Sequence, residues 1–529
     1  MEFSFLMQIV AAVIAALLLK LWLARKQSGQ GKRKTGKAAP EPPGAWPIIG
    51  HLPLLASVSH PHRAFAALAD KYGPAFIIRM GLSRMLIVST KEVAKECFTT
   101  NDRVFATRPH TIAGKLMAYD HAIMGFSPLG PVWKESRKIA TMELFSARRI
   151  EMLKHVRSSE INAWVKELFV KWRENEEKPL ELEMKSQLDD LTFNVLMQMV
   201  AGKRYFGDNV DKADEEMASS FSQAMKQFNH YLGTSGIYDA LPFLEWFDFK
   251  GDAKAMKRAH REMDSIVQNW VDEHRERRGR RGGSSSSDQG HDFIDVLLSM
   301  EEAGQFTVTL PGKDTAIKAL ALTQLVAGVD SMANTLVWAL SLLLTNRHVL
   351  EKVLDELDSH VGRVRFVEES DLPKLKYLQA VVKESMRLFP VGPLLVPHEA
   401  MEDCQVAGHF VPRGTGLFIN AWAIQRDPRV WSDPDKFLPD RFMTIHADME
   451  LKGQHFDLLP FGSGRRSCPG AALALQVVYV TLARILQVFD IMPQSNVPLD
   501  LEEGFGLLLY KLNPLKVQIK PRLPHHFYE

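Results

Sequence analysis

The sequence predicts a mainly α-helical protein with small β-sheets, preceded by one N-terminal transmembrane helix. Beyond residue 60, most apolar residues recur at three- and four-residue spacing, which is typical of amphipathic and buried helices. Strand-like runs are few and short, and a long apolar stretch begins at residue 4. With 529 residues and 46% hydrophobic content, the chain can bury the core of a large enzyme.

The apolar stretch covers residues 4–23, SFLMQIVAAVIAALLLKLWL, and contains one charge, Lys20. About 20 helical residues cross the hydrocarbon core of a bilayer. Six basic residues follow between positions 25 and 37, and positive charge holds its side of the membrane in the cytoplasm. A cleaved signal peptide carries its charge in front of the apolar region instead. We therefore expect residues 1–24 to form an uncleaved signal-anchor.

A basic and proline-rich linker is expected over residues 25–52, before a catalytic domain at 53–529. Prolines at 40, 42, 43 and 47 exclude helix and stiffen this segment. A semi-rigid spacer of this kind would set the distance and tilt of the soluble body on the membrane.

Helices are predicted by runs such as HRAFAALADKY, ALALTQLVAGV and LVWALSLLL. Strands are predicted by AFIIRM, RMLIVST, CQVAGHFV, GLFIN and LKVQIK. RERRGRRGGSSSSDQG, residues 275–290, is expected to be a mobile surface loop because its glycines, serines and like charges cannot form a core. We expect no nucleic-acid role for its arginines, since no aromatic residues lie among them and the net charge of the chain is only +2.

PFGSGRRSCPG, residues 460–470, places one of only three cysteines among glycine and positive charge. Cys97 and Cys404 lie in ordinary helix-like and strand-like patterns and are expected to pack as small buried residues. Cys468 follows Arg465 and Arg466 and precedes a strong helical pattern, and both features lower the pKa of a thiol. Taken alone, such a loop could serve a nucleophile, a redox sensor or a metal site.

The spacing of Phe461, Gly464, Arg466, Cys468 and Gly470 resembles the haem-binding signature F-x-x-G-x-R-x-C-x-G of the cytochrome P-450 superfamily. The resemblance implies the cytochrome P-450 fold. It also implies a haem b cofactor whose iron takes the Cys468 thiolate as its axial ligand. Thiolate ligation favours cleavage of the O–O bond.

Other motifs carry the resemblance over nearly the whole chain. Glu384 and Arg387 have the E-x-x-R spacing, which places both on one helix face. FLPDRF resembles the family's F-x-P-E-R-F, so Arg441 is expected to complete a buried charge network with them. Asp440 stands where the family more often has glutamate, outside that triad.

Two further motifs imply contacts with the haem propionates. Trp133 and Arg137 have the W-x-x-x-R spacing, and an indole N–H and a planar guanidinium both suit a carboxylate. His398 lies where many relatives carry an arginine or histidine that contacts the other propionate.

The segment LVAGVDSMANTL contains a motif that resembles the family's oxygen-activating helix turn. Asp330 and Ser331 are the acid and hydroxyl that would relay protons, and Ala327 with Gly328 would open the helix beside the haem. Met332 replaces a second hydroxyl residue, which puts tight coupling of electrons to product in doubt.

The anchor, the hinge, FATRP, AWAIQRDP and the cysteine loop resemble plant microsomal enzymes of specialised metabolism. That implies an enzyme of the endoplasmic reticulum membrane, single-pass and facing the cytoplasm. A flavoprotein reductase would feed it electrons from NADPH, and the basic surface near the cysteine loop would suit an acidic partner.

The substrate is expected to be a hydrophobic alkaloid, flavonoid, lignan or terpenoid that is hydroxylated or demethylated with O2. It would be held by mainly apolar segments. They are 113–126, the helix around Phe228 and Tyr231, the turn before Asp330, 394–396 and 505–508. Two alternatives are a haem-thiolate isomerase or dehydratase that needs no electrons, and a non-catalytic haem-binding or scaffold protein.

Overall fold

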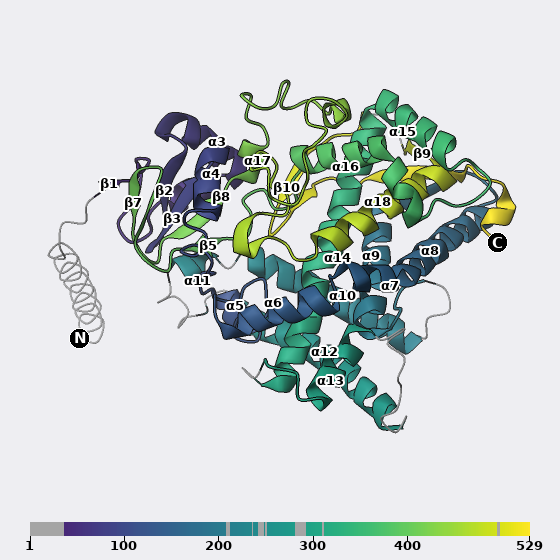
Figure 1. The fold of residues 1–529 in the computed structure, drawn as a ribbon, viewed down its shortest axis with the longest axis horizontal. Coiled ribbons are helices and arrows are strands. Elements are labelled where there is room, and N and C mark those ends of the chain that lie inside the picture. The colour runs from purple at the N-terminus through teal and green to yellow at the C-terminus, as the bar shows by residue number, and fades with distance from the viewer. Residues whose placement is uncertain are drawn as a thin grey trace, which may run out of the picture.

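The computed structural model describes residues 36–207, 212–234, 236–241, 248, 251–280, 292–308, 312–494 and 498–529. Helices form most of it. Strands β1, β2, β3, β5, β7 and β8 gather beside α3, α4 and α17, whereas β9 lies beside α15 (Figure 1). The α-helices are α2 (Leu52–Ala56), α3 (Pro61–Tyr72), α4 (Lys91–Phe98), α5 (Ile112–Met117), α6 (Pro131–Glu143), α7 (Ala147–Met152), α8 (Lys154–Glu174), α9 (Met184–Ala201), α10 (Lys212–Thr234), α11 (Gly236–Ala240), α12 (Asp252–Arg280), α13 (Phe293–Glu302), α14 (Lys313–Thr345), α15 (Arg347–His360), α16 (Lys376–Leu388), α17 (Ala421–Ile424) and α18 (Ala471–Val488). The sequence-based expectation of a mainly helical body with small sheets is confirmed.

Four small sheets account for the described strands. Their orders are β2-β3-β8-β5, β1-β7-β6, β4-β12-β9 and β10-β11. The strands are β1 (Lys37–Ala38), β2 (Ala75–Met80), β3 (Ser83–Val88), β4 (Leu180–Glu183), β5 (His398–Glu399), β6 (Cys404–Val406), β7 (His409–Val411), β8 (Gly416–Ile419), β9 (Phe489–Pro493), β10 (Glu503–Phe505), β11 (Leu509–Lys511) and β12 (Lys516–Pro521). All five predicted strand segments are present, and CQVAGHFV forms a hairpin of two strands, β6 and β7.

Helix α14 runs through the centre of the molecule (Figure 1). It packs against α9, α12 and α13 and also against α16 and α18. Its sequence predicts this position, because apolar residues cover nearly its whole circumference and leave no polar face for solvent. The largest core cluster therefore forms around it.

The part of the predicted linker that the structure describes, residues 36–52, lies on the catalytic body. β1 pairs in parallel with β7, and the carbonyl of Pro40 accepts a hydrogen bond from the N–H of Ile77 at 2.8 Å. His51 is buried and its ring contacts the carbonyl of Pro42 at 2.9 Å. The predicted signal-anchor, residues 1–24, lies outside the described residues.

The prediction of a surface loop from residue 275 is wrong for its first six residues, because α12 continues to Arg280. Acidic partners neutralise the arginines that argued against a helix. Arg275 contacts Asp314 at 2.6 Å, and Arg278 contacts Glu302 at 2.6 Å. The remainder, residues 281–290, lies outside the described part of the chain.

Among the described residues, two helices are long and apolar enough to cross a membrane, α14 and α18. Most of their surface is buried inside the protein, so their composition reflects their place in the core.

Candidate functional site

The cysteine loop lies between the 3₁₀ turn Gly464–Arg466 and the start of α18. The N–H of Cys468 donates to the carbonyl of Phe461 at 2.9 Å and closes the loop. Gly464 has φ +65°, and a Cβ there would lie 2.4 Å from Oδ1 of Asp102. That contact and that backbone conformation both exclude a side chain at this position.

Cys468 is accessible to solvent, yet burial is the largest influence on its pKa. Burial raises the pKa of the thiol above its usual value, against the opposing effects of the Gly470 N–H and of the Arg137 guanidinium. The expectation that Arg465 and Arg466 lower this pKa is therefore wrong. A bound metal ion deprotonates a thiol outright, so a metal ion on Cys468 would hold its sulfur as the thiolate.

Three guanidinium groups, Arg108, Arg137 and Arg466, gather near this sulfur. Nη2 of Arg137 donates to the carbonyl of Ser467 at 2.8 Å, next to the cysteine. Arg466 donates to the carbonyls of Ala106 and Ser127 at 2.6 and 2.7 Å. Among the described residues, none of the three has a carboxylate partner.

The three groups act on one another electrostatically. Burial, then the charge of Arg137, lowers the pKa of Arg466 to about 9. Burial, then the charges of Arg466 and Arg137, also lowers the pKa of Arg108. Buried cations without counter-charges are costly, so this cluster favours a strongly anionic ligand.

Arg108 is a member of this cluster that the sequence interpretation did not assign to the site. It is buried and donates to the carbonyls of Gly125, Val396 and Pro397 at 2.7–3.2 Å. It therefore ties two of the predicted substrate segments together. The FATRP motif contains Arg108 and could have pointed to it. The spacing of the motif does not indicate, however, that Arg108 lies beside Arg137 and Arg466.

Trp133 and His398 lie beside these guanidiniums. The guanidinium of Arg466 lies 4.1 Å from the centre of the Trp133 ring, and that of Arg137 lies 5.7 Å from it. Nδ1 of His398 lies 2.7 Å from the carbonyl of Phe105 and must donate there, which leaves Nε2 of the neutral ring as an acceptor. Burial, followed by the charges of Arg108 and Arg466, lowers the pKa of His398 far below its usual range.

These residues fit a haem group. An accessible sulfur suits the iron, and the uncompensated guanidiniums suit the two propionates. Nη1 of Arg466 is buried and has no hydrogen-bond partner among the described residues, which leaves a donor for a carboxylate. Arg108, Arg137 and Arg466 would hold the propionates, and Cys468 would bind the iron. His398 would donate to a propionate only in its protonated form, because Nε2 of the neutral ring is an acceptor.

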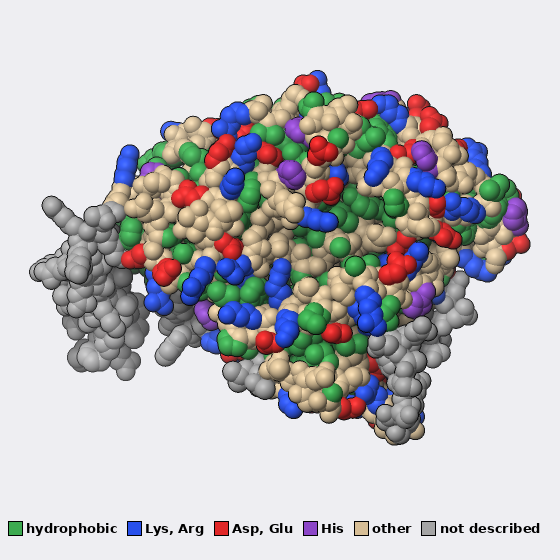
Figure 2. Space-filling model, viewed as in Figure 1, with side chains coloured by type: hydrophobic (Ala, Val, Ile, Leu, Met, Phe, Trp, Pro, Cys, Tyr) green, Lys and Arg blue, Asp and Glu red, His purple; other side chains and the backbone are tan. Residues whose placement is uncertain are grey.

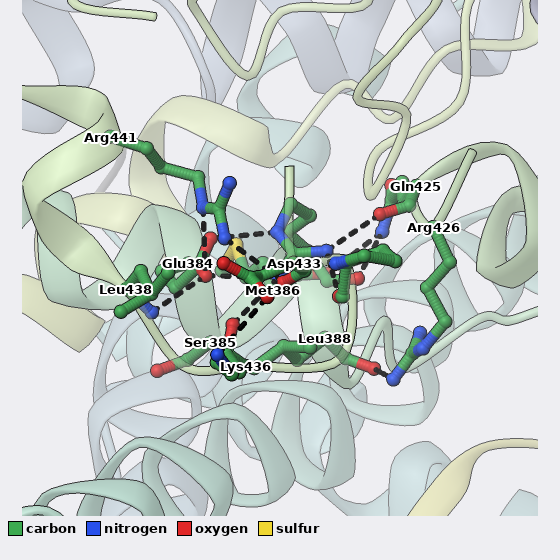
Figure 3. Close-up of polar contacts among 12 residues, drawn as sticks. Glu384, Ser385, Met386, Leu388, Gln425, Arg426, Asp433, Lys436, Leu438 and Arg441 are labelled. Atoms are coloured by element: carbon green, nitrogen blue, oxygen red, sulfur yellow. Dashed lines mark hydrogen bonds and ion pairs between the residues drawn. The ribbon is translucent and has the colours of Figure 1, made fainter. Parts of the chain in front are cut away.

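The predicted charge triad forms a buried network (Figure 3). Nε and Nη2 of Arg387 donate to the Glu384 carboxylate at 2.7 and 2.9 Å, and Nε of Arg441 donates to it at 3.1 Å. All three side chains are at most 3% exposed. Asp440 lies outside the triad and contacts Lys352 at 2.9 Å.

Gln425 connects this network to the cysteine loop. Its carbonyl accepts a hydrogen bond from Arg387 at 2.8 Å, and its Oε1 accepts one from the N–H of Leu459 at 2.9 Å. Leu459 comes directly before the loop. The triad therefore fixes the base from which the cysteine is presented.

The central turn of α14 is the accessible part of a helix that is otherwise largely buried. Ala327 is exposed, and Gly328, Asp330 and Ser331 are partly exposed. Ser331 donates to the carbonyl of Ala327, four residues earlier in its own helix, at 2.7 Å. A Cβ on Gly328 would lie 2.5 Å from Leu196, so this glycine allows close packing of α9.

Asp330 contacts residues from two other helices. Lys185 on α9 lies 3.0 Å from Oδ1 of Asp330, and Nδ2 of Asn229 on α10 donates to Oδ2 at 2.5 Å. Lys185 also contacts Asp189 at 2.5 Å. Sequence reasoning did not identify Lys185 or Asn229 as partners of Asp330, because pairing across helices leaves no local signal. Asp189, four residues after Lys185 in α9, was also missed.

The other predicted substrate residues differ in exposure. Val396 is 41% exposed, and residues 505–508 are partly exposed. Phe228 is fully buried in the core, which corrects its assignment to the substrate surface, while Tyr231 is partly buried. Met332 is 3% exposed and packs in the same core.

Comparison with known proteins identifies the family. The Cytochrome P450 family profile matches residues 40–519, and the chain belongs to this family. It is a cytochrome P450 monooxygenase, and this class carries a haem-thiolate group. This finding favours a monooxygenase over the isomerase and scaffold alternatives.

Plant hydroxylases resemble the chain over its full length. Xanthotoxin 5-hydroxylase of Arabidopsis thaliana is 46% identical over 99% of both chains. Strychnine-10-hydroxylase of Strychnos nux-vomica is 44% identical over 100% of both. A solved structure of a zebra fish cytochrome P450 with progesterone has a TM-score of 0.73 and 27% identity, and covers 87% of this chain and 100% of that one.

Proposed function

We propose that this protein hydroxylates or demethylates a hydrophobic plant specialised metabolite, such as an alkaloid, flavonoid, lignan, terpenoid or furanocoumarin. The observation that carries the proposal is the accessible Cys468 beside one buried guanidinium, Arg108, and two partly buried ones, Arg137 and Arg466, none of which has a carboxylate partner among the described residues. The relatives named above hydroxylate xanthotoxin and strychnine, which supports this class of substrate.

A bound haem supplies the oxygen chemistry that protein side chains lack. The residues of this chain anchor it, through Cys468 on one side and the propionate contacts at its edge. The accessible turn at Ala327 in α14 is proposed to face the substrate. Asp330 and Ser331 are the groups proposed to move protons there, with Lys185 holding the Asp330 carboxylate.

A reductase is proposed to dock on the face that carries α5 and α6. Figure 2 shows Lys and Arg side chains gathered there. Lys134, Lys138 and Arg465 are exposed near the cysteine loop. Such a surface attracts an acidic partner and raises the rate of encounter. The N-terminal signal-anchor is proposed to hold the protein in the endoplasmic reticulum membrane with its body in the cytoplasm.

The test uses membranes that contain the full chain and a plant NADPH-dependent reductase. A panel of alkaloids, flavonoids, lignans, terpenoids and furanocoumarins is incubated with and without NADPH, and products are measured by mass spectrometry. We expect a product that gains one oxygen or loses a methyl group only with NADPH. Cys468→Ser is the matched control and should abolish both product and the thiolate-type spectrum of the reduced carbon-monoxide complex. Conversion without NADPH would contradict the proposal.

A further inference from the structure

A short hairpin carries one of the predicted substrate segments, residues 505–508. Its strands β10 and β11 have three residues each and pair only with one another. An isolated two-stranded hairpin is marginally stable in water. Contacts with the rest of the protein must therefore fix its position.

The hairpin lies beside the candidate haem site. The N–H of Leu509 donates to the carbonyl of Val391 at 2.8 Å, and Phe505 packs in one cluster with Leu394. The side chain of Leu395 lies 3.8 Å from the position that a Cβ on Gly462 would take. Residues 391–395 thus connect the hairpin to the cysteine loop.

Glu503, at the start of β10, is held by the beginning of α3. Nε of Arg63 donates to its carboxylate at 2.8 Å, and Nε2 of His62 lies 3.2 Å from the same oxygen. The ring of His60 donates to the Glu503 carbonyl at 2.7 Å. The Glu503 side chain is 1% exposed, so its carboxylate is shielded from water on one side of the pair, while the Arg63 side chain is 52% exposed.

His62 connects the Glu503 carboxylate to Phe505, because it contacts both side chains. Residues two apart in a strand point to the same face, so Glu503 and Phe505 lie on one side of β10. The rings of His62 and Phe505 lie 5.6 Å apart. Asn420 donates to the His62 carbonyl at 2.8 Å and fixes α3 to the end of β8. The position of Phe505 therefore follows from an anchored chain of contacts.

We propose that Glu503 is a positioning residue that sets the size and orientation of the molecules that fit above the haem. It does so through the placement of the 505–508 segment. The inference rests on the proposed function, because it requires that this segment face the substrate. Loss of the carboxylate charge would leave Arg63 and the hairpin free to shift, and displacements of about 1 Å near a reacting centre have large effects.

The test compares Glu503→Gln with Glu502→Gln in the full-length, haem-loaded protein. Glu502 is exposed, so the control makes the same change one residue away. The probes are imidazole and 4-phenylimidazole, whose binding to haem iron is measured by absorption spectroscopy. For Glu503→Gln we expect the Kd of 4-phenylimidazole to change by about fivefold or more, since pocket shape discriminates small apolar groups by such factors. The Kd of imidazole should stay within about twofold, as should both values in the control.

Arg63 provides a second pair of variants in case Glu503→Gln folds poorly. Its side chain is 52% exposed, so its replacement is well tolerated. Arg63→Gln should reproduce the selective shift for 4-phenylimidazole, and Arg63→Lys, which keeps the charge, should largely restore the wild-type value.

Hydrogen exchange of residues 503–511 gives a readout that needs no haem ligand. Exchange should be faster in Glu503→Gln than in Glu502→Gln. Unchanged exchange, or equal changes for both imidazoles, would overturn the positioning role while leaving the proposed function intact. A wild-type protein without a thiolate-type spectrum would overturn the proposed function and this inference with it.

Discussion

The guanidinium of Arg466 lies 4.1 Å from the centre of the Trp133 ring, while its Nη1 is buried without a hydrogen-bond partner among the described residues. The ring fixes the orientation of the guanidinium, and Nη1 is left to donate a hydrogen bond to a ligand. A residue that is both oriented and unsatisfied is prepared for a ligand, and a haem propionate has the matching charge.

Arg466→Gln should therefore weaken haem binding. Loss of a charge-assisted hydrogen bond of about 1.5–3 kcal/mol corresponds to roughly 10- to 150-fold in affinity. The rate of haem transfer to a scavenger protein measures the effect. Arg465→Gln is the control, because Arg465 is 57% exposed and contacts Asp102 at the surface. Equal haem loss in both variants would contradict the assignment.

Glu384→Gln should destabilise the protein by about 3–5 kcal/mol, because it leaves Arg387 and Arg441 as buried charges without their carboxylate. Urea unfolding of the haem-loaded protein measures the loss. Asp440→Asn should cost only about 0–1 kcal/mol, since the Asp440 side chain is 55% exposed. A small effect of Glu384→Gln would show that the network is dispensable for stability.

Asp330→Asn should lower the rate of product formation by about 100-fold if Asp330 moves protons, which is the usual scale for acid–base groups. NADPH consumption per product should rise. Asp189→Asn alters the other carboxylate beside Lys185 and should have a much smaller effect. Similar losses in the two variants would assign the effect to the charge of Lys185 and not to a proton relay.

Acid should weaken the contacts that the Glu503 carboxylate makes with His62 and Arg63. Burial opposes ionisation of Glu503, but hydrogen bonds from His62 and Arg63 outweigh it and lower the pKa from 4.5 to about 2. The pair therefore stabilises the folded state fully above pH 4.5 and loses this effect as the pH falls toward 2. About 1.4 kcal/mol per pH unit gives roughly 3 kcal/mol. The free energy of unfolding of wild type and Glu503→Gln can be measured between pH 2 and 5. The difference between the two proteins should shrink as the pH falls, and a constant difference would contradict this prediction.

Reversal of charge at Lys134 and Lys138 should slow reduction by the reductase about three- to tenfold at low salt, and high salt should narrow the difference. Stopped-flow formation of the reduced carbon-monoxide complex measures the rate. Lys257→Glu, an exposed change on α12, is the control. A loss that does not depend on ionic strength would argue against electrostatic docking.

Local sequence patterns predicted the helices and strands that are long enough to show a clear apolar periodicity. The strand over AFIIRM and the helix over HRAFAALADKY agree with β2 and α3 within one residue. The short strands β10 and β11 were missed, because three residues carry too little pattern to separate a strand from a loop.

The site was predicted where a motif fixed the residues and missed where the fold brings distant residues together. Glu384, Arg387 and Arg441 meet as expected. Arg108 and Lys185 act through partners far away in the sequence. The predicted lowering of the Cys468 pKa was wrong for a related reason. The sequence shows the neighbouring arginines but does not show the burial that raises this pKa.

The pairing of β12 with β4 joins the last part of the chain to residues 180–183. During synthesis, β4 and the helices beside it must wait for more than half of the protein before this partner exists. Contacts over such separations form late and slowly. β12 is also the central strand between β4 and β9, so a nonsense mutation that removes it should leave both strands without their shared partner and destabilise the chain.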